Sequence, residues 1–274
     1  MPQTRKITLI GTGLMGAPMS RNLMASGHNL TVWNRSPERA APLVTQGAKT
    51  APTVAQAVAG AEVIITMMSD GFATQALLDD ESFINALNSG MIWIDMSSAK
   101  PEHARAQSAH LAALGVAHLD APVSGGTKGA EAGSLAIMAG GDPEIFNQVT
   151  DIFSAMGRPV HVGPSGAGQL CKLANQTIVA VTIAAVAEAT LLAQKGGADP
   201  AALRAALKGG FADSVILQQH GERMSERDFA PGGLSKFQLK DLDNTLAEAH
   251  ALAVYLPHNQ ALRHRFETLA NEMG

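Results

Sequence analysis

The chain has 274 residues, which is enough to bury one large core or two modest ones. With 46% hydrophobic and 16% charged residues, its composition is typical of a compact soluble protein. The formal net charge of -4 provides no basic surface for nucleic acid, and the single cysteine excludes an internal disulfide and fits a reducing compartment.

The N-terminal part of the chain alternates short β-rich runs with segments of helical period. Each run consists of apolar and β-branched residues bounded by Gly, Asn or Asp. This alternation predicts an α/β fold with a largely parallel, doubly wound sheet. The expected strands are KITLI (6–10), NLTVW (29–33), EVIIT (62–66), GMIWIDM (90–96), AHLDA (117–121), LAIMAG (135–140) and RPVHVG (158–163).

From about residue 167 onward the β-rich runs stop and only helical periods follow. A long apolar helix is expected over 169–194, followed by helices over 199–208, 213–225, 235–254 and 257–272. The change of pattern predicts two domains, an α/β domain over 1–164 and a helical domain over 165–274 that includes the long helix.

No segment is expected to span a membrane. The longest charge-free part of the apolar helix, Leu173 to Ala187, is interrupted by Asn, Gln and Thr and falls short of the roughly 20 apolar residues that a span needs. The N-terminal MPQTRK leads directly into a strand, without the apolar region of a signal peptide. We predict a cytoplasmic protein with no membrane partner.

The segment GTGLMG (11–16) places three glycines in GxGxxG spacing between an expected strand and an expected helix. The first glycine permits a tight turn, the second lets the backbone approach a pyrophosphate, and the third lets the helix pack on the strand. In this context a dinucleotide site is favoured over a plain glycine turn. The domain over 1–164 is therefore predicted to bind NAD(P), with Gly11, Gly13, Leu14, Met15 and Gly16 at the cofactor.

The end of the second strand indicates which dinucleotide is bound. NAD sites usually carry Asp or Glu there, for the ribose 2′-hydroxyl, whereas this chain has Asn34, Arg35 and Ser36. A guanidinium and a hydroxyl suit a 2′-phosphate. We predict NADP as the cofactor, with NAD as the alternative; the competing interpretation is a solvated loop arginine.

Lys172 lies near the start of the apolar helix 169–194, with Asn175 three residues later on the same face. An ammonium group on an Ala- and Val-rich helix either extends to water or is retained for chemistry. Reduction of a carbonyl by a hydride needs an acid that protonates the developing alkoxide. Lys172 is the candidate for that acid, because an ammonium also stabilises negative charge in a cleft poor in water.

Several motifs, in order along nearly the whole chain, resemble those of the β-hydroxyacid dehydrogenases. The motifs are GTGLMGAPMSRNL (11–23), DMSS (95–98), DAPVSGGTKGAEAG (120–133), GQLCKLANQ (168–176) and KDL (240–242). The resemblance implies a Rossmann domain, a long interdomain helix and an all-α C-terminal domain. It also implies NAD(P)-linked interconversion of a small β-hydroxyacid with its semialdehyde or ketone, of the tartronate semialdehyde or 3-hydroxyisobutyrate type.

The resemblance further implies roles for individual residues. Lys172 is expected to be the general acid/base, with Asn175 beside it, and Ser124, Gly125 and Gly126 are expected to bind the substrate carboxylate through a hydroxyl and free backbone N–H groups. The other residues expected at the cofactor are Met67, Met68, Ser97, Ser98 and Lys240. A plain helix N-cap is the competing interpretation for one of the two serines.

Two departures and two alternatives remain open. Ser69 stands where the family tends to have Pro, and the chain ends at NEMG, before a further helix that relatives usually have. A glyoxylate or succinic semialdehyde reductase is the alternative enzyme, and a catalytically silent dinucleotide-binding protein is the alternative outside the enzymes. An exposed apolar interdomain helix would favour a homodimer or homotetramer, and the spacing of the nine histidines predicts no metal site.

Overall fold

The computed structural model describes residues 4–230 and 234–273, and the chain divides into two compact units, Met1–Lys172 and Leu173–Gly274. The boundary expected at 164/165 lies just before helix α10 (Ala167–Lys195), whereas the two units meet inside that helix. The division into domains at 164/165 therefore stays a prediction.

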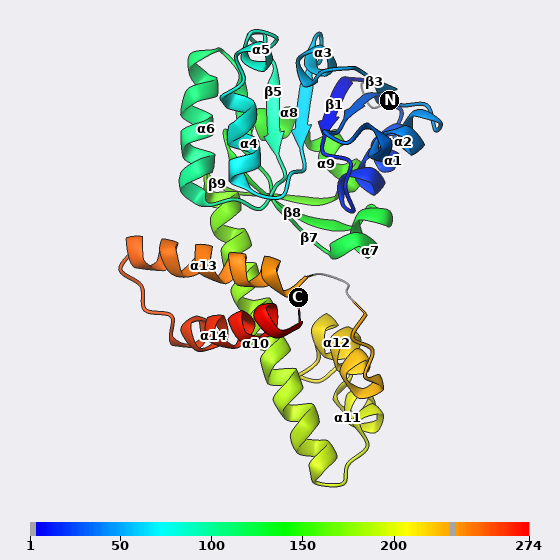
Figure 1. The fold of residues 1–274 in the computed structure, drawn as a ribbon, viewed down its shortest axis with the longest axis vertical. Helices are drawn as coiled ribbons and strands as arrows, with labels where there is room; N and C mark the ends of the chain where they lie inside the picture. The colour runs from blue at the N-terminus through cyan, green and yellow to red at the C-terminus, as the bar shows by residue number, and fades with distance from the viewer. Residues whose placement is uncertain (1–3, 231–233, 274) are drawn as a thin grey trace. The chain divides into compact units, whose positions relative to one another are not determined.

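The first unit is built on a nine-stranded sheet (Figure 1). Its parallel part has the order β3-β2-β1-β4-β5-β6, which is the order of dinucleotide-binding Rossmann folds and confirms the predicted fold class. The strands are β1 (Lys6–Ile10), β2 (Asn29–Trp33), β3 (Lys49–Thr50), β4 (Val63–Thr66), β5 (Ile92–Asp95), β6 (Ala117–Asp120), β7 (Val123–Ser124), β8 (Leu135–Gly141) and β9 (Gly157–Gly163).

The far end of the sheet departs from parallel pairing. Strand β8 pairs antiparallel with both β6 and β7, and β9 then adds parallel to β8. The sequence pattern did not predict β3 or β7, because each has only two residues and shows no alternation. Strand β7 matters for the site, because it pins Ser124 opposite Ala136 and so fixes the turn that follows.

Helices cover both faces of the sheet, and alternate strand residues point to different faces. In β1, Ile7 and Leu9 belong to one buried cluster and Ile10 to the other. The first cluster includes residues of α1 (Gly16–Ala25), α2 (Ala41–Val44), α7 (Gly126–Glu131) and α9 (Thr150–Met156). The second includes residues of α3 (Val54–Val58), α4 (Gly71–Leu78), α5 (Glu81–Ile84) and α6 (Pro101–Ala113).

The described part of the second unit is helical, as the sequence predicts. Besides the rest of α10 it contains α11 (Pro200–Leu207), α12 (Val215–Glu226), α13 (Ser235–Ala251) and α14 (Pro257–Met273). Its buried core is small: Ala180 of α10 packs with Leu242 of α13 and Leu262 of α14. Capping side chains start two of the helices, since Asp199 accepts from the first turn of α11 and Ser214 from that of α12.

Helix α10 is longer than its charge-free stretch suggested. It has 29 residues, and its most apolar 18-residue window has a mean hydropathy of 1.7, so by length and composition alone it could cross a membrane. Core helices of soluble proteins share these properties. Only 17% of that window is buried within the chain, which leaves apolar side chains such as Ile178 and Leu192 exposed. The absence of a membrane partner stays a prediction.

Candidate active site

The glycine turn between β1 and α1 has the geometry of a pyrophosphate cradle. Gly11 has φ +101, and a Cβ there or at Gly16 would collide with backbone oxygen, of Met67 and of Gly11 respectively. A Cβ at Gly13, in contrast, would meet no heavy atom within 4 Å. The fold therefore needs glycine at positions 11 and 16, whereas Gly13 leaves open space near the helix N-terminus. The residues present fit a dinucleotide phosphate.

Asn34 fixes the glycine turn from the neighbouring strand. Its side-chain oxygen accepts from the Thr12 N–H at 3.1 Å, and its side-chain nitrogen donates to the Ser36 carbonyl at 3.0 Å. The side chain of Arg35 is exposed, and that of Ser36 is half-buried. The structure thus places Asn34 as a brace within the fold, and leaves the Arg35 guanidinium accessible to a ligand.

A buried polar network lies beneath this turn at the ends of β4 and β5. Asp95 accepts from the Thr66 hydroxyl at 2.9 Å and from the Ser97 N–H at 3.0 Å, and the Ser97 hydroxyl accepts from the Met68 N–H at 2.9 Å. Burial raises the pKa of Asp95, although its hydrogen bonds act in the opposite direction. Met67 and Met68 line the Gly11 turn, with the Met68 sulfur 3.4 Å from where a Gly11 Cβ would be.

Ser97 and Ser98 do not cap helix α6. The helix begins at Pro101, and the N-cap residue is Lys100, whose side chain makes no cap hydrogen bond. The capping interpretation of the DMSS turn is therefore wrong, because Pro101 sets the helix start three residues further on. Ser97 is fully buried and holds the Met68 backbone, while Ser98 is half-buried.

The segment that follows β6 forms the predicted carboxylate-binding turn. Ser124 is half-buried at the end of β7, and Gly125 and Gly126 are exposed, with φ +140 and +61. These φ values favour glycine. Gly125 is also the N-cap residue of α7.

Lys172 lies against the same segment. Its ammonium donates to the Val123 carbonyl at 2.8 Å, and its side chain is half-buried. The acceptor immediately precedes Ser124 in the chain. The structure therefore brings the predicted acid and the predicted carboxylate-binding turn together within the first unit, at one hydrogen bond.

The predicted site residues of the second unit belong to a series of side-chain hydrogen bonds within that unit. Asn175 donates to the Gln176 side chain at 2.9 Å, and Gln176 donates to Asp241 at 2.6 Å. Asp241, which is 7% exposed, forms an ion pair with Lys240 at 3.4 Å. Sequence reasoning identified Asn175 and Lys240 but not Gln176, which connects α10 to α13.

Sequence reasoning also missed Asp120 and Gln169. The buried Asp120 carboxylate accepts from the backbone N–H groups of Gly166 and Gln169, at 2.8 Å each. Burial raises the pKa of Asp120 to about 6, against the lowering effect of these two hydrogen bonds. A carboxylate at the end of a strand, directly before the APVSGG segment, was the available signal.

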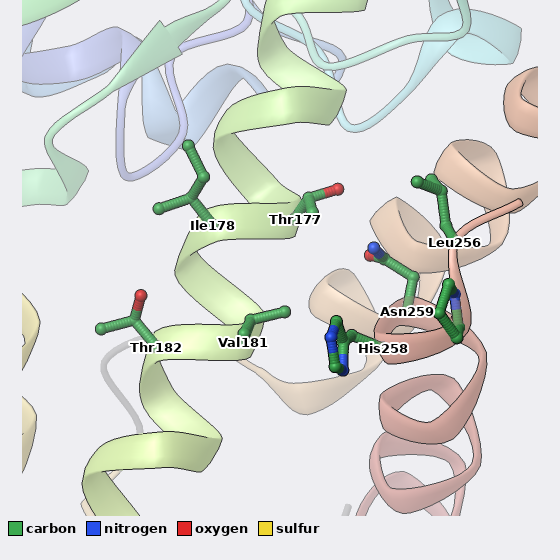
Figure 2. Close-up of a pocket in the computed structure, with 8 residues that line it drawn as sticks. Thr177, Ile178, Val181, Thr182, Leu256, His258 and Asn259 are labelled. Atoms are coloured by element: carbon green, nitrogen blue, oxygen red, sulfur yellow. The ribbon is translucent and has the colours of Figure 1, made fainter. Parts of the chain in front are cut away.

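The second unit has a pocket of about 360 Å³ that contains none of the predicted site residues (Figure 2). Figure 2 shows Thr177 and Val181 of α10 extending toward Asn259 and His258 at the start of α14. The Asn259 side-chain oxygen is buried and has no hydrogen-bond partner among the described residues. The described residues contain no group of three or more His, Cys, Asp and Glu side chains placed to hold a metal ion.

Two family models match adjoining parts of the chain. Residues 6–165 match the NAD binding domain of 6-phosphogluconate dehydrogenase, and residues 166–274 match the NAD-binding model of NADP-dependent 3-hydroxyisobutyrate dehydrogenase.

Individual proteins resemble the chain over almost its full length. The 2-hydroxy-3-oxopropionate reductase of Escherichia coli is 42% identical over 98% of this chain and 92% of its own. The 3-hydroxyisobutyrate dehydrogenase of Pseudomonas aeruginosa is 35% identical over 95% of this chain and 90% of its own. Among solved structures, the Mycobacterium tuberculosis 3-hydroxyisobutyrate dehydrogenase with L-serine has a TM-score of 0.89 and 30% identity, over 98% of this chain and 95% of that one.

The glycine turn yields a prediction with an internal control. Gly13→Ala adds a methyl group into open space, so the melting temperature should stay within a few degrees while NADPH binding weakens at least tenfold. Gly16→Ala should instead destabilise the fold by about 1–3 kcal/mol, because its Cβ meets the Gly11 carbonyl. Thermal melts and NADPH fluorescence titrations measure both effects. Unchanged NADPH affinity in Gly13→Ala would place the pyrophosphate elsewhere.

Proposed function

The chain belongs to the β-hydroxyacid dehydrogenase family, and from this premise we propose that it interconverts a small β-hydroxyacid with its semialdehyde, using NADP and Lys172 as the acid/base. As a member of this family it is an NAD(P)-dependent oxidoreductase acting on a CH–OH group, which sets aside the silent dinucleotide-binding alternative. The proposed substrates are of the tartronate semialdehyde and 3-hydroxyisobutyrate type.

The hydrogen bond from Lys172 to the Val123 carbonyl is the observation that carries the proposed mechanism. It holds an ammonium group one residue away from Ser124 and two from Gly125, whose N–H groups and hydroxyl suit a carboxylate. In a β-hydroxyacid only three bonds separate the carboxylate carbon from the reacting oxygen. A short substrate bound through its carboxylate at 124–126 would therefore present that oxygen to Lys172.

The chemistry divides between the cofactor and the chain. When bound, the nicotinamide supplies the hydride for reduction and accepts it in oxidation. Lys172 donates a proton from its ammonium to the carbonyl oxygen as that oxygen becomes an alkoxide, and in the oxidation direction its neutral amine takes the hydroxyl proton. Asn175 is proposed to hydrogen-bond the substrate or orient the lysine.

The exposed Arg35 guanidinium supports the preference for NADP. The second strand ends without the carboxylate that would bind a ribose 2′-hydroxyl and repel a phosphate. Leu14, Met15, Asn34, Ser36, Met67, Met68, Ser97, Ser98 and Lys240 remain the proposed cofactor-binding residues besides the glycines. For Asn34 and Ser97 the hydrogen bonds described above favour an indirect role, through the backbone that each one holds.

We also propose a cytoplasmic homodimer or homotetramer. The second unit exposes many large apolar side chains for a part of the chain with so small a core. They include Ile178, Leu191 and Leu192 on α10, Phe211 before α12, Val215 at its start, and Val254 and Tyr255 before α14. Exposed apolar area of this kind is what self-association buries.

The first prediction from this proposal concerns the cofactor. Arg35→Asp should weaken NADP(H) binding by roughly 10- to 150-fold, which corresponds to the 1.5–3 kcal/mol of a charge-assisted hydrogen bond, and should change NAD(H) binding little. Arg39→Asp, at an exposed arginine four residues away, is the matched control for a change of net charge. Equal kinetic constants of the wild type for both cofactors would contradict the NADP preference.

The second prediction concerns the carboxylate. Gly125→Ala places a methyl group at φ +140 and should raise the KM for carboxylate substrates at least tenfold, while the Kd for NADPH changes less than twofold. Gly90→Ala, with φ +89 in an exposed turn, carries a similar backbone strain away from the site and should leave the KM unchanged. If both variants have the wild-type KM, the carboxylate binds elsewhere.

The third prediction tests the mechanism itself. Lys172→Met keeps most of the side-chain volume and removes the charge, so it should fold and bind NADPH but lose about 10²–10⁴-fold in kcat for semialdehyde reduction. The wild-type kcat should fall at high pH as the ammonium is lost, and that fall should vanish in the variant. Lys195→Met, at the exposed end of α10, should keep full activity.

The same assay separates the enzyme alternatives, since NADPH oxidation is followed with tartronate semialdehyde, methylmalonate semialdehyde, succinic semialdehyde and glyoxylate in parallel. A Lys172→Met enzyme that retains most of its activity on the best of these substrates would remove the lysine from the mechanism.

A further inference from the structure

Asp120 and Gln169 form a buried junction between the end of β6 and the first turn of α10. Both side chains have no exposed surface. Asp120 accepts from the N–H groups of Gly166 and Gln169, while the Gln169 side chain accepts from the Ala99 N–H at 2.9 Å and donates to the Ser97 carbonyl at 2.8 Å. Three segments that are distant in the sequence therefore meet at two side chains.

The two segments that meet at this junction stay in step along the sequence. Asp120 contacts Gln169, and three residues further along each segment Val123 contacts Lys172. The segment 120–123 thus runs beside the first turn and a half of α10. A shift of the helix at its start changes where the Lys172 ammonium lies relative to Val123 and Ser124.

The backbone at the junction is shaped for this contact. A Cβ on Gly168 would collide with the carbonyl oxygens of Asp120 and Met138, and a Cβ on Gly140 would lie 2.7 Å from the Asp120 carboxylate. Glycine at both positions lets β6, β8 and α10 approach closely enough for the carboxylate to reach the helix N-terminus. An ordinary helix start does not need this arrangement: α8 (Pro143–Gln148) and α11 are capped by Asp142 and Asp199, which directly precede them.

We infer that Asp120 and Gln169 are positioning residues for the reaction, which fix the first turn of α10 so that the Lys172 ammonium is held at the carboxylate-binding turn. This inference rests on the role proposed above for Lys172. Asp120 occupies the helix N-terminus and contacts the helix through backbone N–H groups, so it acts on the reaction through the lysine. Gln169 ties the same turn to the Ser97 segment, which in turn holds the Met68 backbone beside the glycine turn.

Asp120→Asn is the first test. The amide can accept from only one of the two N–H groups and turns a donor toward the other, so the start of α10 should loosen. We expect kcat to fall about 10- to 100-fold, as for a misplacement of about 1 Å, with the Kd for NADPH within twofold of the wild type. The deuterium isotope effect on kcat, measured with 4-deuterated NADPH, should rise as proton and hydride transfer become slower than product release.

Asp142→Asn is the matched control. Asp142 accepts from two backbone N–H groups at the start of α8, at 2.7 and 3.2 Å, in the same unit but on a helix without proposed site residues. Both N–H groups donate to the same oxygen of Asp142, so the amide oxygen of the variant can keep both bonds. Neither kcat nor the isotope effect should change. Equal kcat values for the Asp120 and Asp142 variants, or a rise in the NADPH Kd that accounts for the loss, would overturn the inference.

Gln169→Met keeps the test decisive if Asp120→Asn fails to fold. It removes two hydrogen bonds to the Ser97 segment but leaves the carboxylate and both helix N–H groups paired, and it should lower kcat with the same rise in the isotope effect. A folded Gln169→Met enzyme with wild-type kcat and isotope effect would overturn the inference. Lys172→Met distinguishes failure of the proposed mechanism from failure of the positioning role. If Lys172→Met stays active, the proposed mechanism is wrong. If Lys172→Met is inactive but Asp120→Asn is fully active, only the positioning role is refuted.

Discussion

Two neighbouring strands of the sheet end in buried carboxylates, and the rest of the site depends on how these two charges are satisfied. Asp95 of β5 and Asp120 of β6 are register partners. Asp95 accepts from the Ser97 N–H, just after β5, and Asp120 accepts from the N–H groups of Gly166 and Gln169 at the start of α10. Asp95 thereby fixes the turn that holds Met68 beside the glycines, and Asp120 fixes the start of α10. Because buried carboxylates must be hydrogen-bonded to be tolerated, the exits of both segments are specified by the same requirement.

This arrangement costs stability at neutral pH. Burial raises the pKa of Asp120 from 3.8 to about 6, with Asp95 adding to the rise. Between these values Asp120 binds more protons in the folded protein than in the unfolded chain. Its contribution to stability is therefore most favourable below about pH 4 and is lost as the pH rises through 6. The shift corresponds to about 3 kcal/mol. A charge kept at that cost is easier to understand if the geometry that it imposes on α10 is needed for the reaction than if it served stability alone.

The sequence was sufficient where structure follows from local pattern and insufficient where it follows from distant pairing. The seven long strands and the five C-terminal helices were all predicted, because apolar periodicity and flanking turn residues are local signals. Strands β3 and β7 are too short to show a period. The hydrogen bonds of Asp120 join residues 46 and 49 positions apart, and those of Gln169 join residues about 70 apart. Composition and spacing carry no information about such pairs. A carboxylate at the strand end before APVSGG could mark Asp120 as a candidate, but not show which residues it contacts.

The position of Lys172 on an apolar helix also depends on contacts with residues distant in the sequence. Helix α10 is largely apolar, but the side chains three and four residues from Lys172 are those of Gln169, Asn175 and Gln176, which are polar. The explanation for Lys172 lies in the Val123 carbonyl, which belongs to the segment that Asp120 begins. A lysine extending only to water would need no such acceptor and no fixed helix start. Asp120 and Val123 thus contact Gln169 and Lys172, one turn apart on α10. In the proposed mechanism, a change at Asp120 would therefore move the Lys172 ammonium relative to the proposed carboxylate-binding turn.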